Sequence, residues 1–312
     1  MPVEIHPGQI ARLGRLELLA KSTVEGFITG LHKSPFHGFS VEFAEHRQYN
    51  AGESTRHLDW KLYARTEKLF VKRFEEETNL RAQLVIDASS SMWYPGGVDP
   101  NGPELNKIKF AVLAAASLME LFKRQRDAVG LSLFGEKLDV HTPARSSGAH
   151  HRSLIHMLEE LLDRSDEVPP VGTLGPDALH AIAEATHRRS LVIVFSDFLD
   201  PTGDPSAWMD ALQHMRHNKH EVVVFQTLDK STEEQFEFDN RPTLFKDLES
   251  GLELRLHPEE VRDAYRNRMN AFQSQLREEC SKNQVDLIEV DIEAGIEPVL
   301  SAYLLKRQRV KR

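Results

Sequence analysis

The residues best placed to do chemistry in this chain are oxygen-bearing side chains that follow apolar segments. Residues 87–91 read Asp-Ala-Ser-Ser-Ser, the pattern D-x-S-x-S, directly after a short apolar stretch. Asp197 follows a second, longer apolar stretch, SLVIVFS at residues 190–196. Thr173 lies between the two in the chain, in a Gly-Thr-Leu sequence that leads into an expected helix.

These residue types suit a hard divalent cation. Mg²⁺ prefers six oxygen ligands at about 2.0–2.1 Å, keeps several waters and usually takes only one or two carboxylates. Asp87 and Asp197 would supply negative charge, while Ser89, Ser91 and Thr173 would supply neutral hydroxyl oxygens. With few direct carboxylate bonds the ion stays electrophilic, and one position is left for an Asp or Glu of another molecule. The set therefore predicts Mg²⁺ (or Mn²⁺ in its place) as cofactor and a binding function that needs no nucleophile.

The elements that must position these residues alternate between strand and helix from residue 81 to the end. This alternation predicts a doubly wound α/β fold with a mostly parallel sheet, in which ligands bind at the carboxyl ends of the strands. The expected strands are 83–87, 128–134, 190–196, 220–228 and 285–290, with 137–141 as a hairpin partner of the second. The expected helices are 106–124, 153–162, 176–186, 205–216, 258–282 and 298–308.

Two regions depart from this alternation. An insertion near 229–257 contains short apolar pieces at 236–238 and 252–256, which suggest a small antiparallel excursion. Residues 1–80 form an accessory lead-in, in which 10–31 carry the apolar spacing of a one-sided helix. The rest of the lead-in is dense in charged and aromatic residues, with short extended pieces such as 68–74.

The five oxygen-bearing residues resemble the metal-ion-dependent adhesion site of von Willebrand factor type A domains. That site consists of D-x-S-x-S, a threonine loop and an aspartate after a later strand, and all the positions occur here in order. The resemblance implies that Ser89, Ser91 and Thr173 touch the ion directly and that Asp87 and Asp197 act largely through water.

A second resemblance covers the lead-in and spans nearly the whole chain. GFSVEF at 38–43, HRQY at 46–49, LDW at 58–60, AR at 64–65 and VKRFE at 71–75 are similar to the signature of the bacterial family called domain of unknown function 58. In that family the block precedes an A-type domain. The family implies a chaperone or assembly role beside an AAA+ ATPase of the MoxR type. The partner that presents the Asp or Glu would then be this ATPase or the ATPase's client.

The charged residues of this lead-in block admit two interpretations. They could form a buried network that locks the lead-in onto the main domain, since buried pairs favour specificity more than stability. They could equally form a docking face for the ATPase. The residues concerned are Arg47, Arg56, Asp59, Arg65 and Glu75.

The composition of the chain restricts its possible cellular location and the classes of ligand that it could bind. The formal charge of −9 argues against nucleic acid as the main ligand, because phosphate neutralisation needs clustered cations. The single cysteine, Cys280, excludes an internal disulfide and suits a reducing compartment. The chain shows neither a secretory signal at its start nor an apolar stretch of membrane-spanning length. The cytoplasm is therefore the expected location.

Rival explanations remain open beside the metal site. A metal-dependent phosphohydrolase using Asp87 is the enzymatic alternative, although the second acid that such an enzyme needs is replaced by Ser89. Serines after a strand also commonly cap the next helix. The histidines at 150, 151 and 156 are expected to form a solvated cluster on a loop. We expect a protein-binding module and no enzymatic activity.

Overall fold

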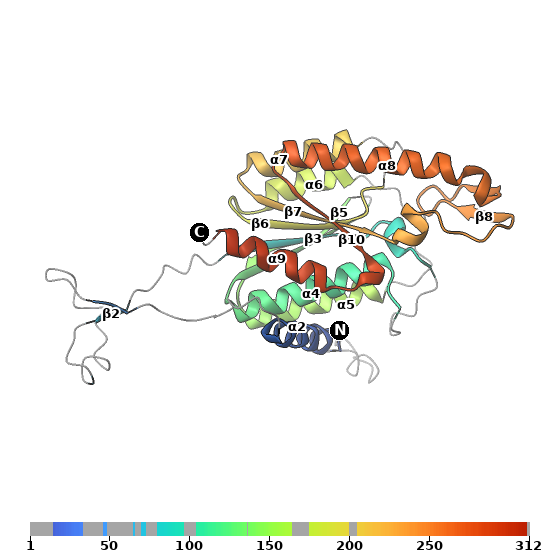
Figure 1. The fold of residues 1–312 in the computed structure, drawn as a ribbon. Coiled ribbons are helices and arrows are strands. Elements are labelled where there is room, and N and C mark those ends of the chain that lie inside the picture. The colour runs from blue at the N-terminus through green and yellow to red at the C-terminus, as the bar shows by residue number, and fades with distance from the viewer. Residues whose placement is uncertain are drawn as a thin grey trace, which may run out of the picture. The chain divides into compact units, whose positions relative to one another are not determined.

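A six-stranded sheet forms the centre of the large unit (Figure 1). The computed structural model describes residues 15–33, 46–48, 65, 70–72, 80–96, 104–135, 137–163, 175–199 and 205–310. The strands follow the order β10-β7-β6-β3-β4-β5, and all neighbours are parallel except β4 and β5. Their bounds are Arg81–Asp87 (β3), Ala128–Phe134 (β4), Leu138–Arg145 (β5), Leu191–Ser196 (β6), Glu221–Leu228 (β7) and Asp286–Asp291 (β10). The predicted mostly parallel α/β fold is confirmed.

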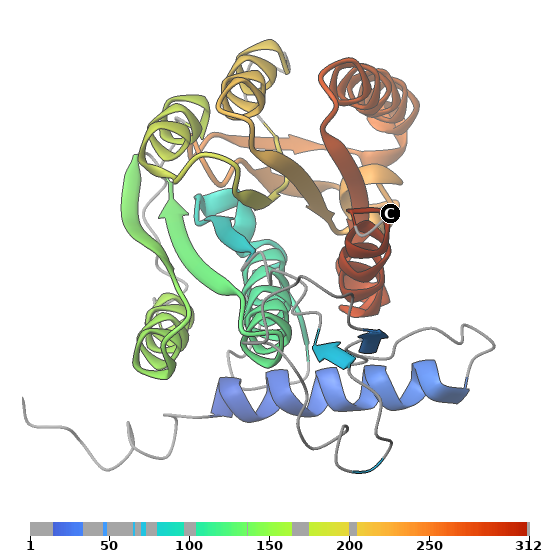
Figure 2. The ribbon, with the colours of Figure 1, turned by 90° about the vertical axis from the view of Figure 1, so that its left-hand side faces the viewer.

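Helices cover both faces of this sheet, as the end-on view of Figure 2 shows. One face is covered by α4 (Lys107–Arg124), α5 (Gly148–Leu162) and α9 (Glu297–Val310), and the other by α6 (Gly175–Ala185), α7 (Ser206–His217) and α8 (Pro258–Lys282). The central strands are buried on both sides, with every residue of β6 and all but the first of β3 enclosed. Near-continuous apolar runs are the sequence pattern of such strands.

The order of the strands fixes where a ligand would bind. The chain runs outward from β3 through β4 to β5, then returns to the other side of β3 as β6 and continues to β7 and β10. The switch point therefore lies between β3 and β6, which pair from Ala82↔Leu191 to Ile86↔Phe195. In open α/β sheets the crevice beyond the carboxyl ends of two such strands is the usual ligand site.

Most predicted helices match within one or two residues, but α5 begins five residues earlier than predicted. Its start is at Gly148 because the Ser147 side chain accepts a hydrogen bond from the amide of His150, which caps the helix. The predicted loop cluster of histidines is therefore wrong, since all three lie on this helix. His151 is buried, and His150 Nε2 lies 3.0 Å from the carbonyl oxygen of Val129.

The insertion after β7 contains a hairpin, although one of its expected pieces is wrong. The predicted piece at 236–238 is not a strand; β8 (Thr243–Lys246) pairs instead, antiparallel, with β9 (Glu253–Leu256). Phe236 and Phe238 pack with Phe245 and Tyr265 in an aromatic cluster, with ring centroids 4.5–5.5 Å apart. A short π-helix, η3 (Lys230–Glu234), joins β7 to this cluster.

The first eighty residues do not form a single structural body. The chain divides into two compact units. One consists of Ile28–Asn79 and the other of Met1–Phe27 with Leu80–Arg312, so the boundary between them in the sequence falls within α2 (Arg15–Lys33). In the large unit, Glu17 and Glu25 of α2 form ion pairs with Lys123 and Arg124 of α4.

The smaller unit contains an antiparallel pair of short strands, β1 (His46–Gln48) and β2 (Phe70–Lys72). The proposed network of five charged residues lies, apart from the exposed Arg65, outside the side chains that the structure describes. None of the helices in the described ranges is both long and apolar enough to span a bilayer.

Candidate metal centre

Asp87 is the last residue of β3 and is almost completely buried. Its Oδ1 accepts the amide hydrogen of Ser89 at 2.9 Å, and its Oδ2 accepts the hydroxyl hydrogen of Ser196 at 2.6 Å. Burial and the negative charge of Asp197 raise the pKa of this carboxyl to about 7, although both hydrogen bonds oppose the shift. Among the residues that the structure describes, the hydrogen-bond donors to the buried Asp87 carboxylate are therefore neutral.

Ser89 and Ser91 place two hydroxyl oxygens beside this carboxylate. Their Oγ atoms are 3.2 Å apart. Neighbouring oxygens of an octahedral Mg²⁺ site lie about 3 Å apart, given bond lengths of about 2.1 Å. Ser89 precedes the short 3₁₀-helix η2 (Ser90–Trp93), but its side chain makes no capping hydrogen bond. The capping explanation is therefore wrong for Ser89, and the hydroxyl pair fits a hard cation.

Asp197 follows β6, on the other side of the switch point, and differs from Asp87 in its partners. Its Oδ1 accepts the amide hydrogen of Leu199 at 3.0 Å, and its Oδ2 accepts from the ammonium group of Lys107 at 2.7 Å. The next residue, Phe198, is fully buried with a φ of 57°, a conformation that bulky residues rarely adopt. The turn that aims the Asp197 carboxylate is therefore held by packing around Phe198.

Trp208 of α7 provides that packing. Its ring lies 4.7 Å from the Phe198 ring, measured between centroids, and 2.0 Å separates its Cη2 from where a Cβ on Gly175 would stand. Gly175 is the first residue of α6. Thr173 lies outside the described residues, but the helix start that follows it packs on the same tryptophan as the turn after Asp197.

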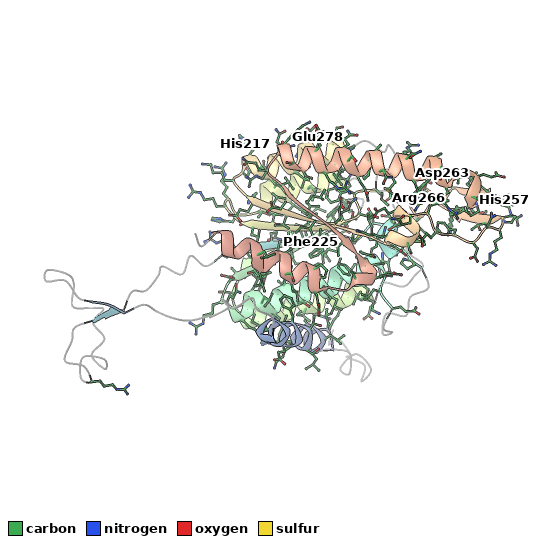
Figure 3. The ribbon with its side chains drawn as sticks, in the orientation of Figure 1. His217, Phe225, His257, Asp263, Arg266 and Glu278 are labelled. Carbon is green, nitrogen blue, oxygen red and sulfur yellow. The ribbon has the colours of Figure 1, made fainter. Side chains whose placement is uncertain are left out.

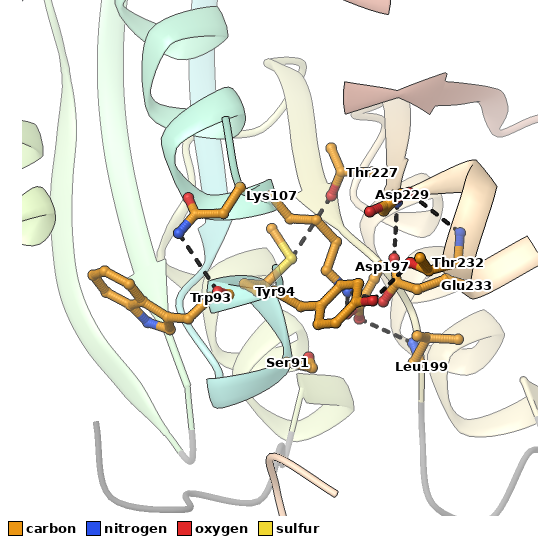
Figure 4. A network of polar contacts seen from close by, with 12 residues as sticks. Ser91, Trp93, Tyr94, Lys107, Asp197, Leu199, Thr227, Asp229, Thr232 and Glu233 are labelled. Atoms are coloured by element: carbon orange, nitrogen blue, oxygen red, sulfur yellow. Dashed lines mark hydrogen bonds and ion pairs between the residues drawn. The ribbon is translucent and has the colours of Figure 1, made fainter. Parts of the chain in front are cut away.

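Lys107 and Glu233 complete the polar network in Figure 4, and sequence reasoning missed both. Lys107, the first residue of α4, is fully buried, and its ammonium donates to Asp197 and, at 2.5 Å, to Glu233 of η3. Burial lowers the pKa of Lys107, but the two carboxylates outweigh it and raise the pKa above its usual value. The only sequence signal for Lys107 is a cation in the first turn of a helix, where the dipole disfavours it.

The charges of this network favour a divalent cation. With all groups ionised, the carboxylates of Asp87, Asp197, Asp229 and Glu233 outnumber the ammonium of Lys107, and a divalent ion would offset most of the excess negative charge. Within the described ranges, no group of three or more His, Cys, Asp or Glu side chains is arranged to hold a metal ion. A metal site here therefore depends on the serine hydroxyls.

Comparisons with known proteins match most of the chain. The family model described as protein of unknown function DUF58 matches residues 45–275. Uncharacterised proteins of Mycobacterium bovis and of two strains of Mycobacterium tuberculosis are each 27% identical over 264 residues, covering 80% of this chain and 78% of each relative.

Two solved structures match much of the chain's length but share little sequence with it. The conserved hypothetical protein BatB from Bacteroides thetaiotaomicron is 15% identical, with 74% of this chain and 99% of that chain covered and a TM-score of 0.44. An aerotolerance-related membrane protein from Bacteroides fragilis is 16% identical, with 68% and 92% covered and a TM-score of 0.41. At these scores neither structure carries a functional argument.

Proposed function

The chain belongs to the DUF58 family of proteins of unknown function, and we propose that it is a divalent-metal-dependent protein-binding module. The observation that carries the proposal is the pair of serine hydroxyls 3.2 Å apart beside two buried carboxylates at the switch point of the sheet. The same four residues resemble the adhesion site of von Willebrand factor type A domains, to which Thr173 would add a fifth oxygen.

The serines and the aspartates of the centre would have different roles. Ser89 and Ser91 would contact Mg²⁺ or Mn²⁺, while Asp87 and Asp197, whose oxygens already accept hydrogen bonds, would balance its charge through water. A bound ion supplies Lewis-acid attraction for a carboxylate. The partner is accordingly a protein that presents an Asp or Glu, and from the family resemblance we propose a MoxR-type AAA+ ATPase or its client, in the cytoplasm, in a chaperone or assembly role.

The first test is metal binding by calorimetry. Wild-type protein is expected to bind Mg²⁺ and Mn²⁺, and Ser89→Ala and Asp87→Ala are expected to bind at least tenfold more weakly, because each removes an oxygen of the centre. Ser274→Ala is the matched control, since its hydroxyl bonds only a carbonyl of its own helix on the exposed side of α8. Equal affinity in all four proteins would exclude the centre.

The second test separates binding from catalysis. Under our proposal, the ATPase co-purifies with wild-type chain in Mg²⁺, and both a chelator and Asp87→Ala abolish the association. A phosphohydrolase would instead turn over phosphate esters in a metal-dependent manner, and Asp87→Ala would remove that turnover. Turnover of such esters by the wild-type protein would replace our proposal with the enzymatic alternative.

A further inference from the structure

The contact between Lys107 and Glu233 is not explained by metal binding. Glu233 lies on η3, after β7, and its exposed side-chain fraction is 13%, whereas that of Lys107 is 0%. Placing an ammonium group in the interior costs several kcal/mol before its partners compensate, and an apolar residue would fill the same space without that cost. Such buried pairs are retained in some proteins because they specify one arrangement of two elements.

A second contact joins the same two parts of the molecule. The hydroxyl of Tyr94 donates to Thr232 Oγ1 on η3 at 2.7 Å. Tyr94 directly follows η2, the element that carries Ser91, and its carbonyl accepts the amide hydrogen of Lys107 at 3.0 Å. Hence the serine loop, residues 89–94, and the start of α4 are joined to each other, and each makes its own hydrogen bond to η3 (Figure 4).

We infer that Lys107 couples the metal centre to the segment Asp229–Lys246, so that this segment responds to occupancy of the centre. The inference rests on the proposed metal binding. Lys107 shares its ammonium between Asp197 at 2.7 Å and Glu233 at 2.5 Å. A divalent charge near Asp197 competes with the ammonium for that carboxylate and repels it, since charge interactions are strong in the buried interior. The ammonium then interacts mainly with Glu233, and the ion pair that holds η3 becomes stronger.

Hydrogen bonds connect η3 to the molecular surface beside α8. The other oxygen of Glu233 accepts the amide hydrogen of Asp229 at 2.8 Å, and the carbonyl of Glu233 accepts the hydroxyl hydrogen of Tyr265 at 2.7 Å. Further along, Arg266 of α8 donates to Gln235. Figure 3 shows Arg266 in the half of α8 that lies nearer the insertion.

The surface reached in this way contains two open polar grooves. Their volumes are about 350 and 450 Å³, and Gln235 and Arg266 line both. Arg262, which lines the first groove, also donates to the carbonyls of Phe236 and Phe238 at 3.2 and 3.1 Å. A more firmly held η3 would therefore order the wall of each groove that Gln235 forms.

Hydrogen exchange measured with and without Mn²⁺ tests this inference on the full chain. In wild-type protein we expect the amides of residues 230–237 to exchange on the order of fivefold more slowly with Mn²⁺, because charged hydrogen bonds to η3 strengthen. In the double variant Lys107→Met/Glu233→Gln both charges of this pair are removed together, and Asp197 loses the ammonium that balanced it. Both serine hydroxyls and both aspartates of the centre remain, and Asp197 has lost its competing ammonium, so this variant is expected to bind Mn²⁺ in calorimetry at least as tightly as wild type and to show no change in exchange.

The control variant is Lys123→Met/Glu17→Gln, which removes an ion pair of the same kind on the surface between α4 and α2; it is expected to respond as wild type does. Wild-type protein that binds Mn²⁺ without slower exchange would overturn the coupling alone, as would a double variant that still shows the protection. Loss of Mn²⁺ binding in the double variant would overturn it too, by making Lys107 part of the centre. Wild-type protein that binds no Mn²⁺ would overturn the proposed function, and the coupling with it.

Discussion

The carboxyl ends of β3 and β6 lie side by side in the sheet, yet they surround their aspartates differently. Asp87, at the end of β3, accepts hydrogen bonds from an amide and a hydroxyl, and its pKa is raised to about 7 by burial and by Asp197. Asp197, after β6, accepts from an amide and from the buried ammonium of Lys107. Within the described ranges, the β6 side of the centre therefore has its own cation and the β3 side has none.

This difference shows where an added cation would lower the free energy most. The ammonium of Lys107 already compensates the β6 side and shares its charge with Glu233. On the β3 side, negative charge accumulates next to the hydroxyls of Ser89 and Ser91, which can contact an ion but cannot neutralise it. The asymmetry thus predicts that removing the charge of Lys107 on the β6 side lowers the free energy of unfolding. Removing the charge of Asp87 on the β3 side is predicted to raise it.

Removal of the cation on the β6 side is expected to have the largest effect. Lys107→Met leaves Asp197 and Glu233 buried without a counter-charge, which should lower the free energy of unfolding by about 3–5 kcal/mol. Urea titration measures the loss. Lys107→Met/Glu233→Gln should lose clearly less, and Lys123→Met, from an exposed ion pair, should lose less than about 1 kcal/mol. A single variant as stable as wild type would mean that Lys107 does not compensate these carboxylates.

Removal of the charge on the β3 side is expected to stabilise the protein when a chelator is present. Because the pKa of Asp87 is about 7 in the folded protein and 3.8 ordinarily, the folded state holds the proton more tightly than the unfolded state. Wild-type stability should therefore fall as pH rises from about 4 to about 7 and change little from this source above that. Asp87→Asn, which keeps the shape, should be more stable than wild type by about 2–4 kcal/mol at pH 8.

The pH profile supplies the control for this second prediction. At pH 4 the wild-type carboxyl already carries its proton in the folded protein, so Asp87→Asn and wild type should unfold at nearly the same urea concentration. If Asp87→Asn exceeded wild type in free energy of unfolding by the same amount at both pH values, packing rather than charge would explain the difference. Asp87→Asn should also lose the stabilisation that Mn²⁺ gives to wild-type protein.

The aspartates and serines of the centre could be predicted from the sequence because their patterns are local. Asp87, Ser89 and Ser91 lie within five residues, and Asp197 ends an apolar run that only a buried strand explains. Strand and helix positions follow from the same short-range periodicity, and α8 begins and ends where the pattern predicts. Whether the four residues bind metal stays a prediction.

The cation on the β6 side could not be predicted in the same way because its partners are distant in the chain. Lys107 and Glu233 are 126 residues apart, and each lies in a segment whose charges look solvated. A lysine before an apolar helix is usually a surface residue, so its burial depends on tertiary packing that no local pattern reports. The late start predicted for α5 has a related cause: the polar residues His150 and Arg152 interrupt the apolar period, although Ser147 caps the helix ahead of them.

Gly175→Ala should disturb the packing that holds the turn after Asp197. An added Cβ would stand 2.0 Å from Cη2 of Trp208, which is fully enclosed and packs against Phe198. Overpacking of this kind typically costs about 1–3 kcal/mol, measurable by urea titration, and Mn²⁺ affinity should fall because the turn after Asp197 shifts. Gly26→Ala, on α2 with open space around the new Cβ, should be neutral or slightly stabilising. Unchanged Mn²⁺ affinity in a destabilised Gly175→Ala would show that this packing does not position the centre.

The smallest expected effect tests whether the β3 side also reaches η3. Tyr94→Phe removes the hydroxyl that donates to Thr232 and should cost about 0.5–1.5 kcal/mol. Tyr303→Phe is the matched control, because its hydroxyl donates to Gln125, outside the polar network of the centre, and its loss should cost a similar amount. Only Tyr94→Phe should weaken the Mn²⁺-dependent slowing of exchange at residues 230–237. The slowing should not vanish, since Lys107 still contacts Glu233. Equal protection in both variants would assign the link to Lys107 alone, and abolished protection in Tyr94→Phe would assign it to the serine loop instead.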